Sequence, residues 1–256
     1  MHVPDRESSP GAVLAFEDRA SESPFIERVW RSHSERGGRF LSVVSPHWEM
    51  VLTRLHGGTI VTVRGPETQP SWAECPEGGE WIAIRFKFGT FMPHLPPSVL
   101  IDRRDVNLPS LSNDGAFLLN DERWTFPGVD DAEAFVDRLV KAGMVTRDAA
   151  VQAALEGDPH ALSPRTTQRR ILRATGVTLT LARQIERARH AAMLLKRQDP
   201  IVAVAHEAGY FDQAHLTRSI RRLIGQTPAM VAREEEQLSF LYNTTPTRAE
   251  YNSDTS

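Results

Sequence analysis

The sequence predicts an α+β protein of two domains, a β-rich barrel or jelly roll followed by an all-α domain. Short runs of alternating apolar and polar residues, separated by Gly and Pro, fill the first half of the 256-residue chain. From about Val129 the apolar residues recur every three or four positions, which is typical of helices. The charged residues are also unevenly distributed between the two parts of the chain. Residues 160–233 hold 13 Lys and Arg against 4 Asp and Glu, a net +9, and the remainder holds 17 against 29, a net −12. The basic segment suits a polyanionic partner.

The composition limits the class of protein. With 40% hydrophobic and 25% charged residues, the chain is typical of a globular protein. It contains no run of 18 apolar residues, so we expect no membrane span. The first ten residues, MHVPDRESSP, lack the apolar core of a signal peptide. The single Cys75 excludes an internal disulfide, and this fits a cytoplasmic location.

The β-rich domain is expected at residues 23–128, after a flexible stretch at residues 1–22. The run WIAIRFKF, residues 81–88, alternates as a strand does. Its apolar face holds Ile82, Ile84 and Phe86, and its polar face holds Arg85 and Lys87. The runs at residues 48–55 and 59–64 flank Gly57-Gly58, which predicts a hairpin.

Helices are expected from Val129 onward. A linker helix at residues 129–145, capped by Asp131, carries an apolar stripe. It could pack between the domains, relay a signal or form a dimer interface, and the sequence does not choose. The next helix is expected to begin at Thr146, and Ser163-Pro164, Asp199-Pro200 and Thr227-Pro228 each read as a cap followed by the first helical residue. Residues 235–256 are polar and are expected to be a disordered tail.

The stretch from Asp199 to Pro228 has the pattern of two helices joined by a tight turn at Gly209. The first helix has an apolar stripe, and Asp212 can cap the second. In the second, four residues point inward: Leu216, Ile220, Leu223 and Ile224. Five point outward: Ala214, Thr217, Arg218, Arg221 and Arg222. This is the geometry of a helix-turn-helix, whose second helix can enter the major groove, although a solvated face on an ordinary helical hairpin remains the alternative.

A second copy of the pattern occurs in SPRTTQRRILRATG, residues 163–176. Its inward residues are Thr167, Ile171 and Ala174, and its outward residues are Arg165, Gln168, Arg169 and Arg173. A longer helix with an apolar stripe from Leu181 to Leu195 would join the two units. Two such units can reach successive major grooves, about 34 Å apart on one face of the duplex.

With these motifs in place, residues 146–234 resemble the DNA-binding domain of the AraC/XylS family of bacterial transcription regulators. The resemblance rests on SPRTTQRRILRATG, RQIERARHAAMLL and IVAVAHEAGYFDQAHLTRSIRRLIGQTPAMV. It implies duplex DNA as the partner and no catalytic residues. It also implies recognition-helix positions for Arg165, Gln168, Arg169, Gln213, Ala214, Thr217 and Arg218, and phosphate contacts for Arg221 and Arg222. His215 could donate to a phosphate or be an ordinary helix residue. One departure, DPHAL at residues 158–162, lengthens the first turn and leaves the angle of the first recognition helix open.

The resemblance further implies a cupin-like N-terminal domain that senses a small molecule or forms a dimer. Three tryptophans are candidates for an effector pocket, with a core role as the alternative: Trp48, Trp72 and Trp81. No metal is expected, because the histidines lack the close His-x-His pair of a metal cupin. RNA polymerase and a small-molecule effector are candidate partners, and the chain could be a monomer or a homodimer. The rival hypothesis is a cupin-type binding protein or enzyme with a helical scaffold.

Overall fold

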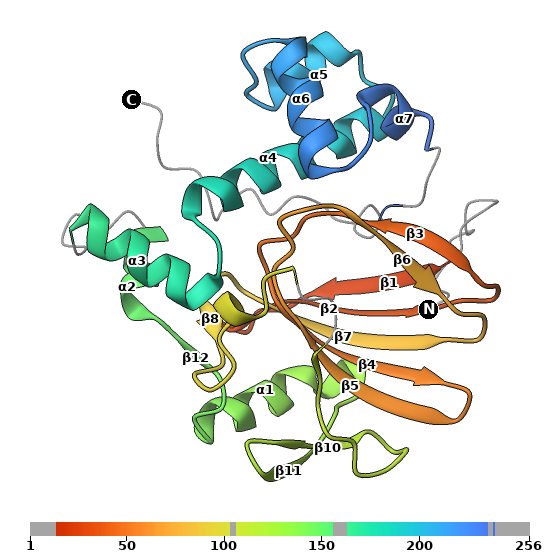
Figure 1. Cartoon of the computed structure of the whole chain (residues 1–256), viewed down its shortest axis with the longest axis vertical. Helices are drawn as coiled ribbons and strands as arrows, with labels where there is room; N and C mark the ends of the chain where they lie inside the picture. The colour runs from red at the N-terminus through yellow and green to blue at the C-terminus, as the bar shows by residue number, and fades with distance from the viewer. Residues whose placement is uncertain (1–13, 103–105, 156–162, 235–237, 239–256) are drawn as a thin grey trace.

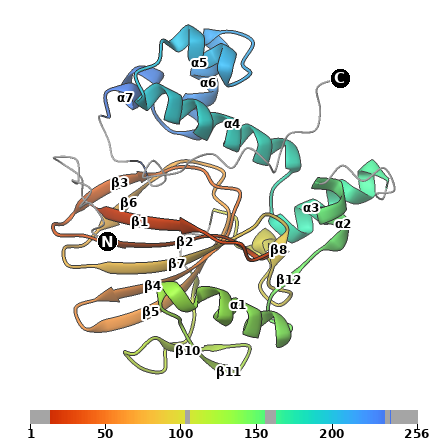
Figure 2. The ribbon, with the colours of Figure 1, turned by 180° about the vertical axis from the view of Figure 1, so that it is seen from behind.

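The computed structural model describes residues 14–102, 106–155, 163–234 and 238. A β-rich domain occupies the lower half of the view in Figure 1, and the helices α4 to α7 lie above it. Helix α1 lies below the sheet, and α2 and α3 lie at its side, as the reverse view in Figure 2 also shows. Among the described residues, no helix has the length and apolar character needed to cross a membrane.

The largest sheet has six antiparallel strands in the order β1-β2-β7-β4-β5-β9. Their bounds, in that order, are Ala15–Ala20, Ile26–His33, Glu80–Phe86, Glu49–Leu55, Gly58–Arg64 and Val106–Asn107. The predicted hairpin is confirmed, since β4 and β5 are joined through His56 and Gly57, both at positive φ. The flexible stretch predicted to reach residue 22 is wrong from Ala15 onward, because β1 pairs along its whole length with β2.

The alternation along the strands gives the sheet two different faces. One face holds the largest core, where Met50, Leu52 and Phe86 pack with Phe135 and Leu139 of α1. Helix α1, Ala132–Lys141, follows the 3-10 turn η2, Val129–Asp131. The helix lies within the predicted range 129–145, and packing between the domains, one of the roles left open for it, is wrong. Its apolar stripe packs on the sheet, on the side away from α4–α7 (Figure 1).

The other face of the sheet looks toward a ribbon of two antiparallel strands, β3 (Gly38–Ser42) and β6 (Ser71–Cys75). Shorter elements complete the domain: β8 Thr90–Phe91, η1 Pro97–Val99, β10 Ala116–Leu119, β11 Glu122–Thr125 and β12 Thr146–Arg147. The fold class is confirmed as a β-rich domain followed by a helical domain.

The helix predicted to begin at Thr146 begins later. Thr146 and Arg147 form β12 and pair with β8, and α2 spans Ala149–Leu155. The Oδ1 atom of Asp148 accepts the N–H of Val151, 3.3 Å away. The cap is therefore Asp148, and the β-branched Thr146 stays in extended backbone.

The helical domain has five helices in the described part of the chain, and three of them start at predicted caps. Its helices are α3 Pro164–Thr175, α4 Leu179–Lys196, α5 Ile201–Glu207, α6 Gln213–Leu223 and α7 Pro228–Ala232. Three predicted caps are confirmed, because the side chains of Ser163, Asp212 and Thr227 accept the backbone N–H three residues on. Thr178, which the sequence did not single out, caps α4 in the same way. The predicted cap at Asp199 is wrong, since Pro200 precedes α5 without a side-chain bond, and Asp131 stands at the start of α1 without one. The buried stripe of α4 packs against α5, α6 and α7 in one apolar cluster.

This cluster crosses the boundary between the domains. Leu41, Val43 and Val44, in and after β3, are buried in it. The N–H of Val44 also donates to the carbonyl of Leu223 at the end of α6, 3.4 Å away. Leu238 is buried in the same cluster and forms a parallel bridge with Leu41. The disordered tail predicted for residues 235–256 is thus wrong at Leu238, while residues 235–237 and 239–256 lie outside the described part.

Candidate nucleic-acid interface and interior cavity

Helix α6 is positioned by a turn whose residues alternate between inside and outside. Gly209 has a φ of 69°, which an L side chain adopts with strain. Tyr210 is buried, and its hydroxyl lies 2.9 Å from Ser219 Oγ of α6. The carboxylate of Asp212 then accepts the N–H of His215, 2.6 Å away, and starts the helix. The turn therefore fixes the residue at which α6 begins and the face of α6 that is exposed.

The outer face of α6 carries the side chains expected there. Gln213, Ala214, Arg218, Arg221 and Arg222 are all exposed, whereas Leu216, Ile220 and Leu223 are buried. The N-terminal turn thus presents small and amide side chains that fit base edges, and the rest presents guanidinium groups that fit base edges or phosphates.

Two residues predicted on this face are partly engaged within the protein. The Thr217 hydroxyl donates to the Gln213 carbonyl, 2.8 Å away, and the side chain is half-buried. The His215 ring packs edge-on against Tyr210, with ring centroids 5.1 Å apart. That contact favours the structural role that the sequence left open for His215.

Helix α3 presents a similar basic face. The four side chains predicted there are all exposed: Arg165, Gln168, Arg169 and Arg173. Arg170 and Leu172 of the same helix are exposed as well. Ile171 and Ala174 are buried against Phe88 and Val151. The helix ends at Gly176, at a φ of 78°, where a Cβ atom would lie 3.0 Å from the carbonyl oxygen of Pro97. The first unit is therefore docked on η1 of the β-rich domain. The DPHAL stretch, residues 158–162, lies outside the described residues.

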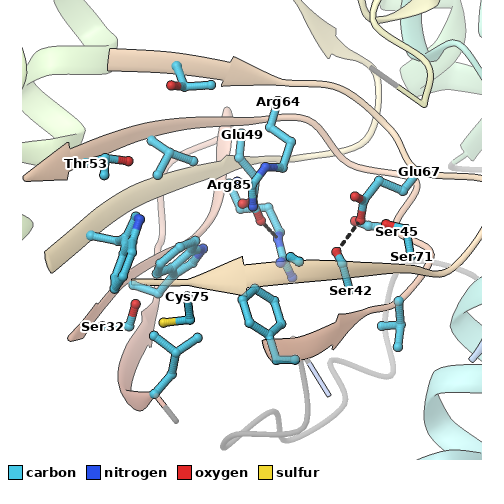
Figure 3. Close-up of a pocket in the computed structure, with 18 of the residues that line it drawn as sticks. Ser32, Ser42, Ser45, Glu49, Thr53, Arg64, Glu67, Ser71, Cys75 and Arg85 are labelled. Atoms are coloured by element: carbon cyan, nitrogen blue, oxygen red, sulfur yellow. Dashed lines mark hydrogen bonds and ion pairs between the residues drawn. The ribbon is translucent and has the colours of Figure 1, made fainter. Parts of the chain in front are cut away.

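An interior cavity of about 480 Å³ lies between the six-stranded sheet and the β3–β6 ribbon (Figure 3). The sheet contributes alternate residues to its wall: Trp30, Ser32, Glu49, Val51, Thr53, Thr62, Arg64, Trp81 and Arg85. The ribbon contributes Phe40, Ser42, Ser71, Ala73 and Cys75. Its volume is in the range of small-molecule sites.

Charged groups gather on one side of the cavity. Arg85 Nε donates to Glu49 Oε1, 2.5 Å away, and Arg64 lies beside them (Figure 3). Both members of the pair are nearly buried. Burial raises the pKa of the Glu49 carboxyl, but Arg85 and Arg64 outweigh it and hold that pKa below its ordinary value. Ser42 Oγ donates to Glu67 Oε2, 2.8 Å away, at another part of the wall.

One wall residue comes from the helical domain. Arg189 of α4 lines the cavity, and only 7% of the residue is exposed. Burial lowers the pKa of its guanidinium from the ordinary value, because nearby Glu186, 3.9 Å away, compensates only part of the lost hydration. Arg189 therefore places a buried charge of the helical domain inside the β-rich domain.

A second contact joins the two domains beside Arg189. The Nδ1 atom of His47 lies 3.0 Å from the Phe86 carbonyl oxygen and 3.2 Å from Glu27 Oε2. Its Nε2 atom lies 4.0 Å from Glu186 Oε1 of α4. Burial raises the pKa of Glu27, yet His47 and Arg85 outweigh it and the pKa falls below its ordinary value.

The predicted tryptophan pocket needs correction. Trp81 lines the cavity, as expected. Trp48 lies in the core on the opposite face of the sheet, where it stacks on Phe86 and its Nε1 donates to the Thr90 carbonyl, 2.7 Å away. Trp72 is 39% exposed and lies under Arg39. Trp30 lines the cavity instead. The pleat of the sheet directs Trp48 away from the cavity, because Trp48 lies on the same face as Met50 and Leu52 of the core.

The cavity wall carries charges that the sequence reading missed: Glu49, Arg64, Arg85 and Arg189. A charged residue inside a run of buried apolar residues was the available signal, as in EMVL and AIRF. Cys75 is buried, and burial raises the pKa of its thiol. Within the described part of the chain, no three His, Cys, Asp or Glu side chains are grouped to hold a metal.

Comparisons with known proteins give one family match. The family described as a helix-turn-helix domain matches residues 160–234, and no curated protein sequence matches the chain. A crystal structure of ToxT from Vibrio cholerae is 11% identical with a TM-score of 0.37, covering 85% of this chain and 98% of that one. ToxT bound to (E)-4-(8-methylnaphthalen-1-yl)but-3-enoic acid is 9% identical with a TM-score of 0.36, covering 85% and 98%. At these TM-scores the likeness carries no argument. The family match and the two capped units identify the helical segment, residues 160–234, as a helix-turn-helix domain of the AraC type.

Proposed function

We propose that this chain is a transcription regulator that binds specific duplex DNA through α3 and α6, with one helix in each of two successive major grooves. The observation that carries the proposal is the exposed face of α6, where Gln213 and Ala214 precede Arg218, Arg221 and Arg222. Gln213, Ala214 and Arg218, toward the N-terminal end of the helix, would meet base edges, and Arg221 and Arg222 further along would meet phosphates.

The salt dependence of binding tests this proposal. Each phosphate neutralised by a Lys or Arg releases counterions, so the affinity falls steeply as salt rises. We expect the logarithm of the binding constant for duplex DNA to fall linearly with the logarithm of the salt concentration. Several phosphate contacts predict a slope of about −4 or steeper. A flat dependence would contradict binding through these arginines.

We further propose that the interior cavity binds a small-molecule effector. The supporting observation is Arg189, since a molecule in the cavity would touch both the sheet and α4 of the DNA-binding domain. Candidate compounds are to be screened by the thermal midpoint of the full chain and by its affinity for DNA. Ala73→Phe, which fills the cavity from β6, should abolish both responses and leave DNA affinity without the compound unchanged. Equal responses in wild type and Ala73→Phe would place the effector elsewhere.

The remaining parts of the proposal concern partners and place. A regulator that activates transcription contacts RNA polymerase, and one that binds DNA in a bacterium works in the cytoplasm at the nucleoid. Two units in one chain let a monomer span two grooves, so binding as a monomer and as a homodimer are both compatible with the proposal. Sedimentation of the chain with and without its operator distinguishes them.

A further inference from the structure

The largest exposed apolar side chain near α6 is Phe211, which is 93% exposed. It lies between buried Tyr210 and Asp212, the cap of α6. Because the chain is turned so that Tyr210 points into the helical core, its neighbour is displayed outward. A single exposed apolar residue is common on protein surfaces. The significance of Phe211 therefore comes from its place, directly beside the start of α6.

The position of Phe211 indicates which kind of molecule contacts its ring. It directly precedes the end of α6 that carries Gln213 and Ala214, and this end of a recognition helix enters the major groove. The exposed arginines on the same helix, Arg218, Arg221 and Arg222, favour a polyanion over a neutral or basic protein surface. The edges of the bases in the major groove are polar apart from one group, the C5-methyl of thymine.

We propose that Phe211 is a specificity-determining residue that packs on a thymine methyl group at the edge of the α6 half-site. The inference rests on the proposed DNA binding and adds a residue outside the polar and basic set that reads and anchors the duplex. Phe211 supplies apolar area, while Gln213 supplies hydrogen bonds and Ala214 leaves room for the close approach. The α6 half-site should therefore contain an invariant thymine next to the bases that Gln213 reads.

The test combines a protein change with a base change. The probe is the duplex that the wild-type full-length chain enriches from random sequences. Each thymine in it is replaced in turn by deoxyuridine, which removes only the methyl group. Affinity is measured by fluorescence anisotropy for wild type, Phe211→Ala, Phe211→Leu and Val202→Ala. Val202 is the matched control, because it lies on α5 and is 68% exposed.

We expect Phe211→Ala to weaken binding about tenfold, the range of one lost base contact. One deoxyuridine replacement should weaken wild type and have no further effect on Phe211→Ala. Phe211→Leu should fall between the two, and Val202→Ala should match wild type throughout. The thermal midpoint of Phe211→Ala should be unchanged, since the ring is outside the core.

Three results would overturn the inference. Phe211→Ala could bind every duplex with the affinity of wild type, which would exclude a contact of the ring with DNA. If transcription by purified RNA polymerase were lost at the same time, the ring would contact a protein partner. Phe211→Ala could instead weaken all duplexes equally without coupling to a thymine methyl, and the ring would then meet the backbone. Failure of the wild-type chain to enrich any duplex would overturn the proposed function itself, together with this inference.

Discussion

Glu49 on β4 and Arg85 on β7 form an ion pair 2.5 Å long inside the β-rich domain, with 8% and 12% of their side chains exposed. The two residues are direct neighbours in the strand register. They lie in the wall of the cavity, together with the charged Arg64 and Arg189 and with aromatic, aliphatic and hydroxyl side chains. Removing Glu49 takes away the hydrogen-bonded partner of a buried Arg85, which keeps only the electrostatic attraction of Glu27 and Glu186.

We therefore predict that Glu49→Ala lowers the free energy of unfolding by about 3–5 kcal/mol. The measurement is urea unfolding of the full chain. The matched control is Glu17→Ala, which breaks the exposed pair of Glu17 with Arg31 and should cost at most about 1 kcal/mol. Equal losses in the two variants would show that burial does not set the strength of the Glu49–Arg85 pair.

The stability should also depend on pH through Glu133. Both carboxylate oxygens accept N–H groups of Arg19, at 2.6 and 2.7 Å, and these bonds lower the pKa of Glu133 to about 2 from its ordinary 4.5. A carboxyl with a lowered folded pKa contributes stability above its unfolded pKa, and the contribution is lost as the pH falls toward 2. About a third of each side chain is exposed, so screening limits the gain to about 1 kcal/mol.

The prediction for Glu133→Gln is a loss of about 1 kcal/mol at pH 7 that shrinks steadily below about pH 5. Urea unfolding of wild type and variant between pH 7 and pH 3 measures it. A gap that stays constant over this range would mean that the bond geometry, and not the charge of Glu133, matters.

Gly176 tests the docking of α3 on the β-rich domain. Gly176→Ala must place a methyl group in left-handed backbone and 3.0 Å from the Pro97 carbonyl oxygen. The control is Gly143→Ala, at a φ of 73° with no atom within 4 Å of the added carbon. We predict a loss of about 1 kcal/mol for the control, and a loss about 1–2 kcal/mol larger for Gly176→Ala. Equal losses in the free energy of unfolding, measured with urea, would show that η1 moves aside for the added methyl group at no cost.

Arg218 and Arg222 separate base reading from anchoring. Both are exposed on α6, but Arg218 is one turn closer to the N-terminal end. We predict that Arg218→Ala costs about 1–3 kcal/mol on the operator and relaxes the choice of one base. Arg222→Ala should weaken all duplexes about equally and reduce the salt slope by about 1. Competition binding with single-base operator variants measures both, and reversed behaviour of the two variants would contradict the assignment.

The sequence predicts the helical domain well because its signals are local. Asp212 caps a helix whose first residues follow it directly, and Gly209 supplies a backbone conformation within the same turn. The outward face of α6 then follows from the helical period alone. The burial of Leu238 was not predictable in this way, because its partner Leu41 lies almost 200 residues earlier in the chain.

The cavity depends on pairing between distant strands. Glu49 and Arg85 are 36 positions apart, and only the register of β4 on β7 brings them together. The alternation of WIAIRFKF correctly predicts that Arg85 faces away from Ile84, but it does not reveal that the opposite face is also covered. The same limit explains why the packing partner of α1 was not predicted. An amphipathic stripe shows that a helix packs on something, but it does not show on which element.

The most direct test of the account is a selection of random duplex DNA by the purified full-length chain at near-physiological salt. We expect a consensus of two short blocks about one helical turn apart, one for α3 and one for α6. Arg165→Ala should relax the choice of a base in one block only, and Arg218→Ala in the other. A consensus that both variants leave intact would contradict the assignment of α3 and α6 as the reading helices.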